Sequence, residues 1–310
     1  MNEFDVIRGI SDRLGEQPEE VVLPIGDDCA VLRLGDREWV AAADMLVSGY
    51  HFEGWASPED VGYKAVAVNV SDVAAMGGIP RFVLTSGGAG ESETTLRCME
   101  GVLEACEEFD VYPLGGDTTR ADALTVNVTI LGELPGVAVL RSGAQPGDLL
   151  AVTGELGAST AGFLILENGG DAPGRLVRRH LRPEPRVDAG RAASDAGVHA
   201  MIDLSDGLAS DVRHVCEQSG TGCRIDLGLL PVAEDTREAA RSFDRDAELL
   251  AATGGEDYEL LIAAPEQVLV DFARQVSVPI TIVGEVTEEG VLFVRDGEVV
   301  EGLSGWDHFS

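Results

Sequence analysis

A long apolar stretch that carries two polar residues constrains the fold of this 310-residue chain more than any other feature. The stretch opens with Ser57-Pro58-Glu59-Asp60, which has the serine cap, early proline and third-position acid typical of a helix start. The pattern predicts a helix that runs to about Met76, where a glycine pair follows. Asn69 and Asp72 share one face of this helix. Because a helix interior does not favour Asp, a buried Asp72 requires a cation or several hydrogen-bond donors.

Acidic residues recur beside glycines, at predicted strand ends and at helix starts. Taken singly, Asp before Gly is an ordinary turn, and Asp at a helix start is an ordinary cap, for which Asp206 is the most natural candidate. Taken together, these segments indicate one site built from distant parts of the chain. The segments are 26–28, Asp44, Asn69 with Asp72, 115–120, 203–211 and 254–257.

The residue types in these segments favour a magnesium site. Carboxylate oxygens without clustered Cys or His suit Mg²⁺, which binds few carboxylates and completes its shell with water and phosphate oxygens. Glycine pairs allow backbone N–H groups to approach phosphate. Carboxylates alone would repel ATP, so several Mg²⁺ ions are a requirement of this interpretation.

Several classes of protein are excluded by simple features. Lys64 is the only lysine and lies inside the predicted helix, so a P-loop and a protein-kinase site are both ruled out. A net charge of -33 opposes binding to nucleic acid or anionic lipid. The five cysteines have irregular spacing, which favours neither a disulfide framework nor a metal cluster. No apolar run spans a bilayer and the first residues lack a signal-peptide pattern, so we expect a cytoplasmic protein.

Strands and helices interleave along the whole chain, which predicts an α/β or α+β fold. The length favours two domains, and a Gly- and Pro-rich segment at 135–148 separates them into residues 1–136 and 137–310. The helix predicted at 92–109 places Leu96, Met99, Leu103 and Cys106 on one side. Further helices are predicted at 158–167 and 208–218, a hairpin at 291–299, and strands at 38–43 (ending at Asp44), 81–86, 111–114, 124–134, 149–153, 201–204, 258–263 and 280–286.

The acidic segments, taken in order, resemble the thiamine-monophosphate kinases, within the superfamily of aminoimidazole ribonucleotide synthetase. The helix stretch from Tyr63 to Gly77 and the segment Gly254 to Leu260 (GGEDYEL) are the most specific matches. The likeness runs from near residue 25 to the C-terminus. The other matching stretches are 26–31, 44–52, 115–120, 203–211 and 306–309.

The resemblance implies that ATP and thiamine monophosphate are converted to ADP and thiamine diphosphate. It implies a two-domain fold of mixed sheets flanked by helices. It also implies a homodimer that pairs through strands of the N-terminal domain, with the site at the junction of the domains and subunits. By motif, His51, Glu256 and Trp306 correspond to substrate contacts, and the Trp306 ring suits a cationic thiazolium. The implied ATP contacts are Gly116, Asp117, Arg141 and Ser205, and the implied Mg²⁺ ligands are Asp28, Asp44, Asp72, Asp117, Asp203 and Asp206.

No catalytic general base is expected for this reaction. The second pKa of a phosphate monoester is about 6, so the attacking phosphate is already mostly ionised at neutral pH. Positioning and charge neutralisation then account for the catalysis. One departure from the family is Ala42-Ala43, where relatives often carry Ser-Thr before the acid. Only backbone carbonyls could contribute there.

Other functions compatible with the sequence belong to three classes. The first class is another ATP-using enzyme of the same superfamily, such as an aminoimidazole ribonucleotide synthetase, which would share the acids but not the GGEDYEL segment. A selenophosphate synthetase would need a reactive Cys or selenocysteine near its N-terminus, followed by a Lys. A non-catalytic maturation scaffold on this fold would bind without turning over ATP. A cation-buffering acidic protein would bind metal without nucleotide preference, and no DxDxDG loop supports it.

The acidic excess predicts a dependence of stability on salt. The ten acids of the segments account for less than a third of the excess of 55 acidic over 22 basic residues, so most of it is surface charge of the kind that halophiles use. We expect the melting temperature to rise as KCl increases, because salt screens the repulsion between carboxylates. Thermal unfolding across a KCl series tests this. A melting temperature that stays level or falls contradicts it.

Overall fold

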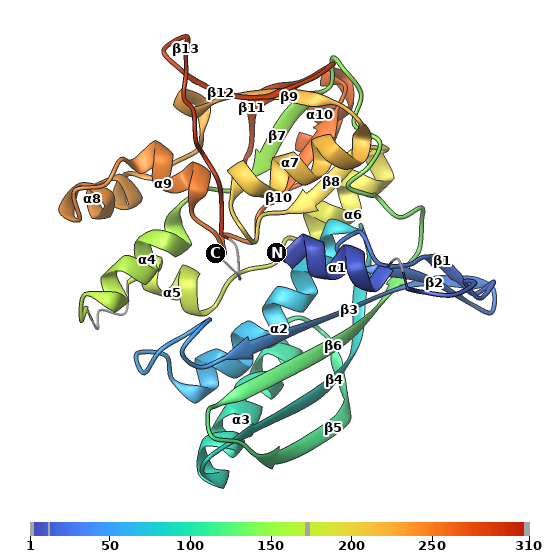
Figure 1. Ribbon diagram of the computed structural model, residues 1–310, viewed down its shortest axis with the longest axis vertical. Helices are drawn as coiled ribbons and strands as arrows, with labels where there is room; N and C mark the ends of the chain where they lie inside the picture. The colour runs from blue at the N-terminus through green and yellow to red at the C-terminus, as the bar shows by residue number, and fades with distance from the viewer. Residues whose placement is uncertain (1–2, 12, 171–173, 307–310) are drawn as a thin grey trace.

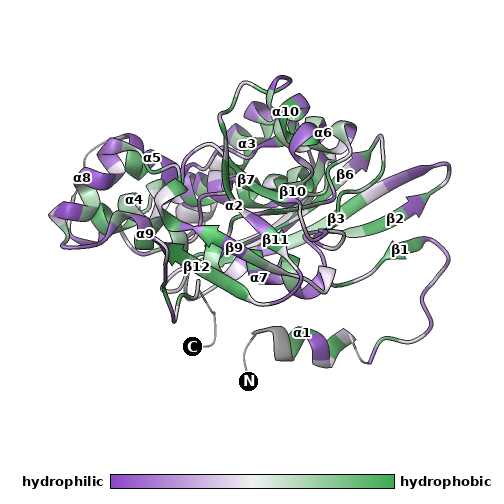
Figure 2. Ribbon diagram, turned by 90° about the horizontal axis from the view of Figure 1, so that it is seen from above, coloured by the Kyte–Doolittle hydropathy of each residue, from purple (hydrophilic) through white to green (hydrophobic). Residues whose placement is uncertain are grey.

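The computed structural model describes residues 3–11, 13–170 and 174–306. Its secondary-structure elements follow the alternation of strands and helices that the sequence predicts. The first part of the chain contains α1 (Glu3–Ser11), β1 (Val21–Leu23), β2 (Ala30–Leu34), β3 (Arg37–Val47), α2 (Pro58–Ala75), β4 (Ile79–Ala89), α3 (Ser92–Glu108), β5 (Tyr112–Arg120) and β6 (Thr125–Leu134). Figure 2 shows α1 set apart from these elements.

The second part of the chain forms a separate sheet with its own helices. Its elements are β7 (Leu149–Thr153), α4 (Ala158–Glu167), α5 (Arg175–Leu181), α6 (Val187–Ala196), β8 (Ala200–Asp203), α7 (Leu208–Ser219), β9 (Gly222–Asp226), the 3₁₀-helix η1 (Leu227–Leu229), α8 (Glu234–Ser242), α9 (Ala247–Thr253), β10 (Leu260–Ala264), α10 (Glu266–Ala273), β11 (Ile280–Thr287), β12 (Val291–Arg295) and β13 (Glu298–Val299).

The two sheets are both mixed (Figure 1). The first has six strands in the order β1-β2-β3-β6-β4-β5, and the second has seven in the order β13-β12-β9-β11-β7-β10-β8. Only β4 with β5 and β9 with β12 are parallel among the described strand pairs. The predicted α+β class with mixed sheets flanked by helices is therefore confirmed. The first sheet ends at Leu134 and the second begins at Leu149, and the boundary at 136 and 137 within that interval stays a prediction.

Helix α2 forms where the sequence predicts it. The Ser57 side chain accepts a hydrogen bond of 3.1 Å from the backbone N–H of Asp60, and Met76 is the C-cap. Nearly every residue of the helix is buried. It packs on β3, β6 and α3 of the first part and also on α6 and β8 of the second. The helix therefore joins the two sheets.

Each sheet buries an apolar core of its own. In the first, Val40, Val83 and Ile130 pack against residues of α2 and α3. The second sheet is covered on both faces, and alternate residues of β10 point to the two sides. One face packs against α7 and α9, and the other against α6 and α10.

The first sheet leaves one face uncovered by helices. Register pairing places Met45, Leu84 and Tyr112 on the side away from α2, and the Leu84 and Tyr112 side chains are 44% and 67% exposed. Trp39 and Phe82 stack on the same face with their ring centroids 6.1 Å apart. This uncovered face carries exposed apolar side chains, and such groups, when they gather on one surface, commonly mark an interface.

Some local predictions were wrong. Asp44 lies inside β3 and not at its end, because the strand continues to Val47. The strand predicted at 111–114 continues through Gly115 and Gly116 to Arg120. Helix α3 buries Cys98, Gly101, Val102, Ala105 and Cys106, whereas Leu96 and Leu103 are exposed. The close approach of α3 to α2 requires small residues at the contact, since a Cβ on Gly101 would lie 1.9 Å from the Glu59 carbonyl oxygen.

The sequence predicted the C-terminal hairpin but missed several other elements. The hairpin at 291–299 is present as β12 and β13, while β1, β2, β9, α5, α6, α8, α9 and α10 were not predicted. Among the described helices, none combines the length and the apolar character needed to cross a bilayer. Residues 307–309 of the matching C-terminal stretch lie outside the described residues.

Candidate active site

A cavity of about 1200 Å³ is lined by residues from both parts of the chain. It collects segments that are far apart in the sequence, as the acidic pattern requires. Ten of the twelve predicted site residues line it, namely Asp28, Asp44, His51, Asp72, Arg141, Asp203, Ser205, Asp206, Glu256 and Trp306. Ala42 and Ala43 also line it, so this departure from the family lies at the site itself.

Three of the predicted metal ligands converge in this cavity. Asp28, Asp72 and Asp203 each offer a carboxylate oxygen, and these oxygens lie within 4.8 Å of one another. Asp72 comes from the last turn of α2 and Asp203 from the end of β8. The Ser71 hydroxyl donates a 2.5 Å hydrogen bond to Asp203 Oδ2, which ties α2 to β8 at this point. The group supplies only oxygen ligands, two of them from a helix and a strand and the third from the segment between β1 and β2, so it fits Mg²⁺.

The acids of this group strongly perturb one another. Burial, together with the charges of Asp44, Asp203 and Asp28, raises the pKa of Asp72 well above its usual value. Burial and the charge of Asp28 raise the pKa of Asp203 to about 8. Such shifts mean that the folded chain holds these carboxylates close together at an electrostatic cost, which a cation would relieve.

Arg141 is the cation that the chain itself places among these acids. Its Nε donates a 3.1 Å hydrogen bond to Asp28 Oδ1, and its backbone N–H donates one of 3.1 Å to Asp27 Oδ2. Burial nevertheless raises the pKa of Asp28, and burial with the charge of Asp28 raises that of Asp27 to about 7. Arg141 therefore compensates only part of the buried negative charge.

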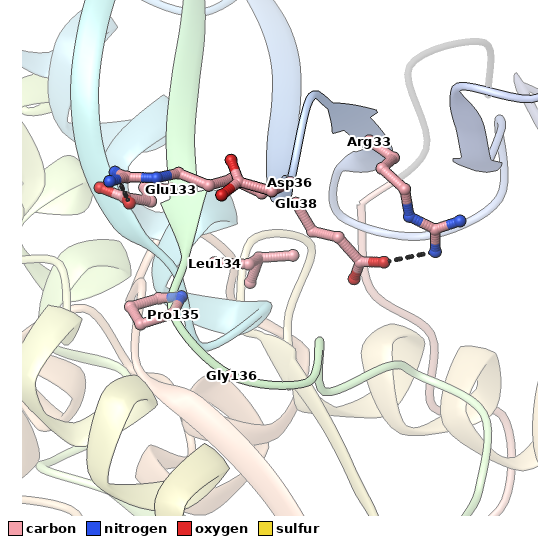
Figure 3. A pocket seen from close by; sticks show the side chains of 8 residues that line it. Arg33, Asp36, Glu38, Glu133, Leu134, Pro135 and Gly136 are labelled. Carbon is pink, nitrogen blue, oxygen red and sulfur yellow. Dashed lines mark hydrogen bonds and ion pairs between the residues drawn. The ribbon is translucent and has the colours of Figure 1, made fainter.

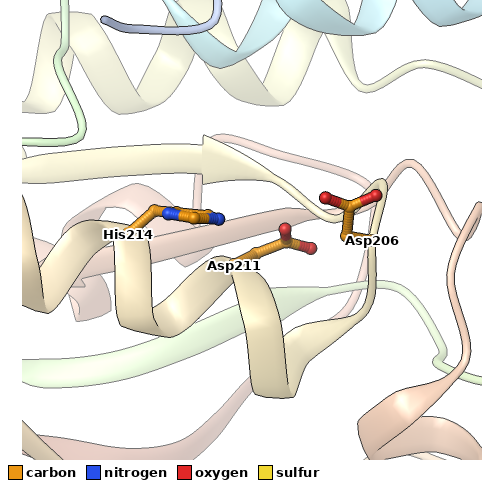
Figure 4. A group of neighbouring side chains, drawn as sticks. All are labelled: Asp206, Asp211 and His214. Atoms are coloured by element: carbon orange, nitrogen blue, oxygen red, sulfur yellow. The ribbon is translucent and has the colours of Figure 1, made fainter. Parts of the chain in front are cut away.

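A second group of possible ligands lies on and before α7 (Figure 4). Asp206, Asp211 and His214 have ligand atoms within 4.8 Å of one another. Gly207, not Asp206, is the N-cap of α7, and its N–H donates a 3.1 Å hydrogen bond to Asp211 Oδ2. The capping role considered for Asp206 was therefore wrong, because Asp211 bonds the N-cap backbone. His214 was missed, although its spacing of i, i+3 from Asp211 was a readable signal.

Glu256 has two basic side chains as its neighbours. Its Oε1 lies 2.7 Å from Lys64 Nζ, and its Oε2 lies 3.3 Å from His180 Nδ1. Glu256 has a left-handed backbone with φ of 65°, which its N–H stabilises by donating a 2.7 Å hydrogen bond to the Ser205 carbonyl. Sequence reasoning missed Lys64 and His180 as site residues. The one available signal was the burial of the only lysine inside an apolar helix.

The remaining two substrate candidates also reach the cavity. His51 Nδ1 accepts a 3.2 Å hydrogen bond from the Val47 backbone N–H, which orients its ring. Trp306 is 60% exposed, and its backbone N–H donates a 3.0 Å hydrogen bond to the Asp206 carbonyl. That bond brings the C-terminal segment to the start of α7, so an exposed indole stands beside the acids.

Gly116 and Asp117 are the two predicted residues that one chain does not bring to the cavity. They lie on β5, the edge strand, three strands away from β3 in the sheet order. This separation corresponds to roughly 14 Å. Register pairing through Ser86 and Asn127 places Asp117 on the same uncovered face as Met45.

A second, smaller cavity of about 460 Å³ lies beside the turn between β2 and β3 (Figure 3). Four of its charged residues form two ion pairs. Arg33 Nη2 lies 2.7 Å from Glu38 Oε1, and Arg37 Nη1 lies 2.6 Å from Glu133 Oε1. None of the predicted site residues lines it, so it adds nothing to the site.

Comparison with known proteins accounts for this arrangement. Family models for AIR synthase related protein match the chain, the N-terminal domain at residues 26–134 and the C-terminal domain at 145–297. The thiamine-monophosphate kinase of Escherichia coli K12 is 40% identical over 324 residues, covering 99% of this chain and 98% of that protein. The chain belongs to the thiamine-monophosphate kinase family.

Solved structures agree with the assignment to this kinase family. AaThiL complexed with AMPPCP and TMP has a TM-score of 0.88 and 33% sequence identity, covering 99% of this chain and 97% of that chain. The hydrogenase maturation protein HypE in complex with ATP has a TM-score of 0.68 at 20% identity, covering 89% of each chain. At that identity the likeness to HypE extends to the fold alone.

The crowded carboxylates predict a metal-dependent change in stability. Asp72→Asn replaces a carboxyl group whose ionisation is opposed by burial and by its acidic neighbours, so we expect its metal-free melting temperature to equal or exceed that of the wild type. Excess Mg²⁺ should raise the melting temperature of the wild type more than that of the variant, because a ligand that binds the folded state stabilises it. Scanning calorimetry with EDTA and with MgCl₂ measures both effects. Asp296→Asn, in the distant hairpin turn, is the control, and an equal Mg²⁺ shift in all three proteins contradicts the metal assignment.

Proposed function

We propose that this chain transfers the γ-phosphoryl group of ATP directly to thiamine monophosphate, forming thiamine diphosphate. The observation that carries the proposal is that Asp28, Asp72 and Asp203 line the same cavity as Arg141 and Glu256. Relatives named thiamine-monophosphate kinase, and a solved relative with AMPPCP and TMP bound, support the choice of substrates.

The acids supply the metal-binding part of this proposal. Asp28, Asp72 and Asp203 would hold Mg²⁺, with Asp44 and Asp206 at neighbouring positions of the cavity. When bound, Mg²⁺ offsets the negative charge of the phosphates and of the transition state. Arg141, which already contacts Asp28, is placed to share its remaining donors with a phosphate oxygen.

The other residues serve to bind and orient the two substrates. We assign Ser205 to ATP, and His51, Glu256 and Trp306 to the acceptor, whose cationic thiazolium suits the exposed indole face. No residue is required to remove a proton, because the acceptor phosphate has a second pKa of about 6. The geometry that lines up acceptor and donor phosphates is then the main contribution of the protein.

This function predicts a defined effect of one carboxylate. Wild-type protein should form thiamine diphosphate from ATP and thiamine monophosphate only when Mg²⁺ is present, and free thiamine should be run beside it as substrate. Asp72→Asn should lower kcat by about a hundredfold or more, in line with the loss of a group that stabilises transition-state charge. Asp296→Asn should retain wild-type rates. Near-normal turnover by folded Asp72→Asn would overturn the metal role.

We also propose that the active form is a homodimer that pairs through the uncovered face of the first sheet. Two features support this: the exposed apolar side chains of Met45, Leu84 and Tyr112, and the position of Asp117 on that same face. A residue that cannot reach the cavity of its own chain can approach one from a partner subunit. We assign Gly116 and Asp117 to contacts with ATP and metal, and the family resemblance supports this assignment.

One substitution that introduces a charge on the uncovered face tests the proposed dimer. Leu84→Arg puts a cation on the uncovered face, so we expect it to shift the protein from dimer to monomer, because an unpaired buried charge opposes association. Leu229→Arg is a matched control, since Leu229 is also about half exposed but lies in η1 of the second part. Sedimentation equilibrium measures the mass. A monomeric wild type, or a variant that stays dimeric, would argue against this interface.

A further inference from the structure

Glu256 is held between two buried groups that the phosphoryl transfer itself does not require. Lys64 is 5% exposed and His180 is 3% exposed. They engage different oxygens of the carboxylate, at 2.7 Å for Lys64 Nζ and 3.3 Å for His180 Nδ1. Each carboxylate oxygen keeps a further lone pair, and Glu256 lines the cavity. The carboxylate is thus fixed at both oxygens while still able to accept from a ligand.

The two groups come from separate rigid elements. Lys64 lies on α2, and His180 lies on α5. The His180 ring packs against Trp55 and Phe163, with centroid distances of 5.4 and 5.6 Å. Since packing from several sides fixes both donors, they impose one orientation on Glu256.

Helix α5 is itself anchored at two points. Arg179 Nη2 donates a 2.9 Å hydrogen bond to Glu259 Oε1, and Arg182 Nε donates one of 2.6 Å to Asp60 Oδ1. Glu259 is fully buried and Asp60 lies in the first turn of α2. These contacts hold α5, and with it His180, against both parts of the chain.

The protonation states of the three groups follow from their surroundings. Burial, and next the charge of Lys64, lower the pKa of His180 to about 3, so its ring is neutral at pH 7. Although burial opposes it, the charge of Lys64 lowers the pKa of Glu256. His180 Nδ1 lies 3.3 Å from Glu256 Oε2 and 3.1 Å from Ser159 Oγ. Because a carboxylate can only accept hydrogen bonds, the tautomer with the proton on Nδ1 is the one that lets the neutral ring donate to Glu256. The cluster therefore has no net charge and presents Glu256 as a hydrogen-bond acceptor.

The chemistry of the acceptor substrate supplies one matching donor. Thiamine monophosphate carries its nitrogen-bound hydrogens only on the exocyclic amine of its aminopyrimidine ring. We propose that Lys64 and His180 are positioning residues that hold the Glu256 carboxylate where it accepts a hydrogen bond from this amine. The inference rests on the proposed function, of which it specifies the recognition of one end of the acceptor.

Two variants of His180 separate the donor from the ring. His180→Asn retains an N–H donor near the position of Nδ1 but loses the ring, whereas His180→Phe retains the ring contacts with Trp55 and Phe163 but loses the donor. His180→Phe also removes Nε2, which is buried and has no hydrogen-bond partner among the described residues. We therefore expect the Phe variant to fold, and circular dichroism and the melting temperature check this. Ser159→Ala is the control, since Ser159 Oγ lies 3.1 Å from Nδ1 but does not contact Glu256 in this scheme.

Calorimetric titration with thiamine monophosphate and steady-state kinetics provide the readout. We expect His180→Phe to raise the Kd and the KM for thiamine monophosphate by about tenfold or more, the size expected for a lost hydrogen bond to a charged group. The KM for ATP should not change. His180→Asn and Ser159→Ala should remain within about threefold of the wild type, a difference of less than one such bond.

Failure of this inference and failure of the proposed kinase function would give different results. If His180→Phe binds thiamine monophosphate like the wild type, or if His180→Asn is the weaker of the two, ring packing is what matters and the inference is overturned. A parallel loss of affinity for ATP would also overturn it, since that indicates general damage. A wild-type protein that neither binds nor phosphorylates thiamine monophosphate overturns the proposed function instead.

Discussion

The burial of helix α2 between the two sheets is the constraint on which the rest of this structure depends. Glycines allow its neighbours to approach closely: a Cβ on Gly101 of α3 would lie 1.9 Å from the Glu59 carbonyl oxygen, and one on Gly190 of α6 would lie 2.0 Å from that of Ala74. Such contacts leave little freedom for the two parts of the chain to move past one another. Lys64 and Asp72 are therefore fixed on one helix, and each meets a group from the second part.

This packing explains how a site of mutually repelling acids can persist. Burial makes each charge in the group of Asp28, Asp72 and Asp203 costly, and Arg141 offsets only part of it. The apolar contacts of α2 have to outweigh that repulsion in the folded state. Repulsion of this kind is common at cation sites. Carboxylates that the fold already holds close together bind a cation more tightly than carboxylates that must first be brought together, at a cost in stability.

The convergence of the three acids could be predicted from the sequence better than the contacts around them. Caps and glycines marked α2 locally, and the motifs identified Asp28, Asp72 and Asp203 without knowledge of the fold. The prediction of which face of α3 is buried was wrong. Apolar spacing favours the side with Leu96 and Leu103, whereas packing against α2 requires small residues at the contact. The shared contact of Lys64 and His180 with Glu256 could not be predicted, since the two residues lie 116 positions apart in the chain and only tertiary packing brings them to one carboxylate. Contacts set by local pattern were predictable, and those set by tertiary approach were not.

The position of Asp117 connects the chemistry of the site to the charge of the surface. Within one chain it lies on the uncovered face beside apolar side chains, away from the acids that it would have to join. Association through that face would bury the apolar groups and bring Asp117 toward a second cavity. Two chains with a net charge of -33 nevertheless repel one another, and the apolar face must overcome that repulsion. Salt shortens the range of the repulsion to about 3 Å at molar concentration. The same ionic conditions that suit the acidic surface would then also favour the assembly that completes the site.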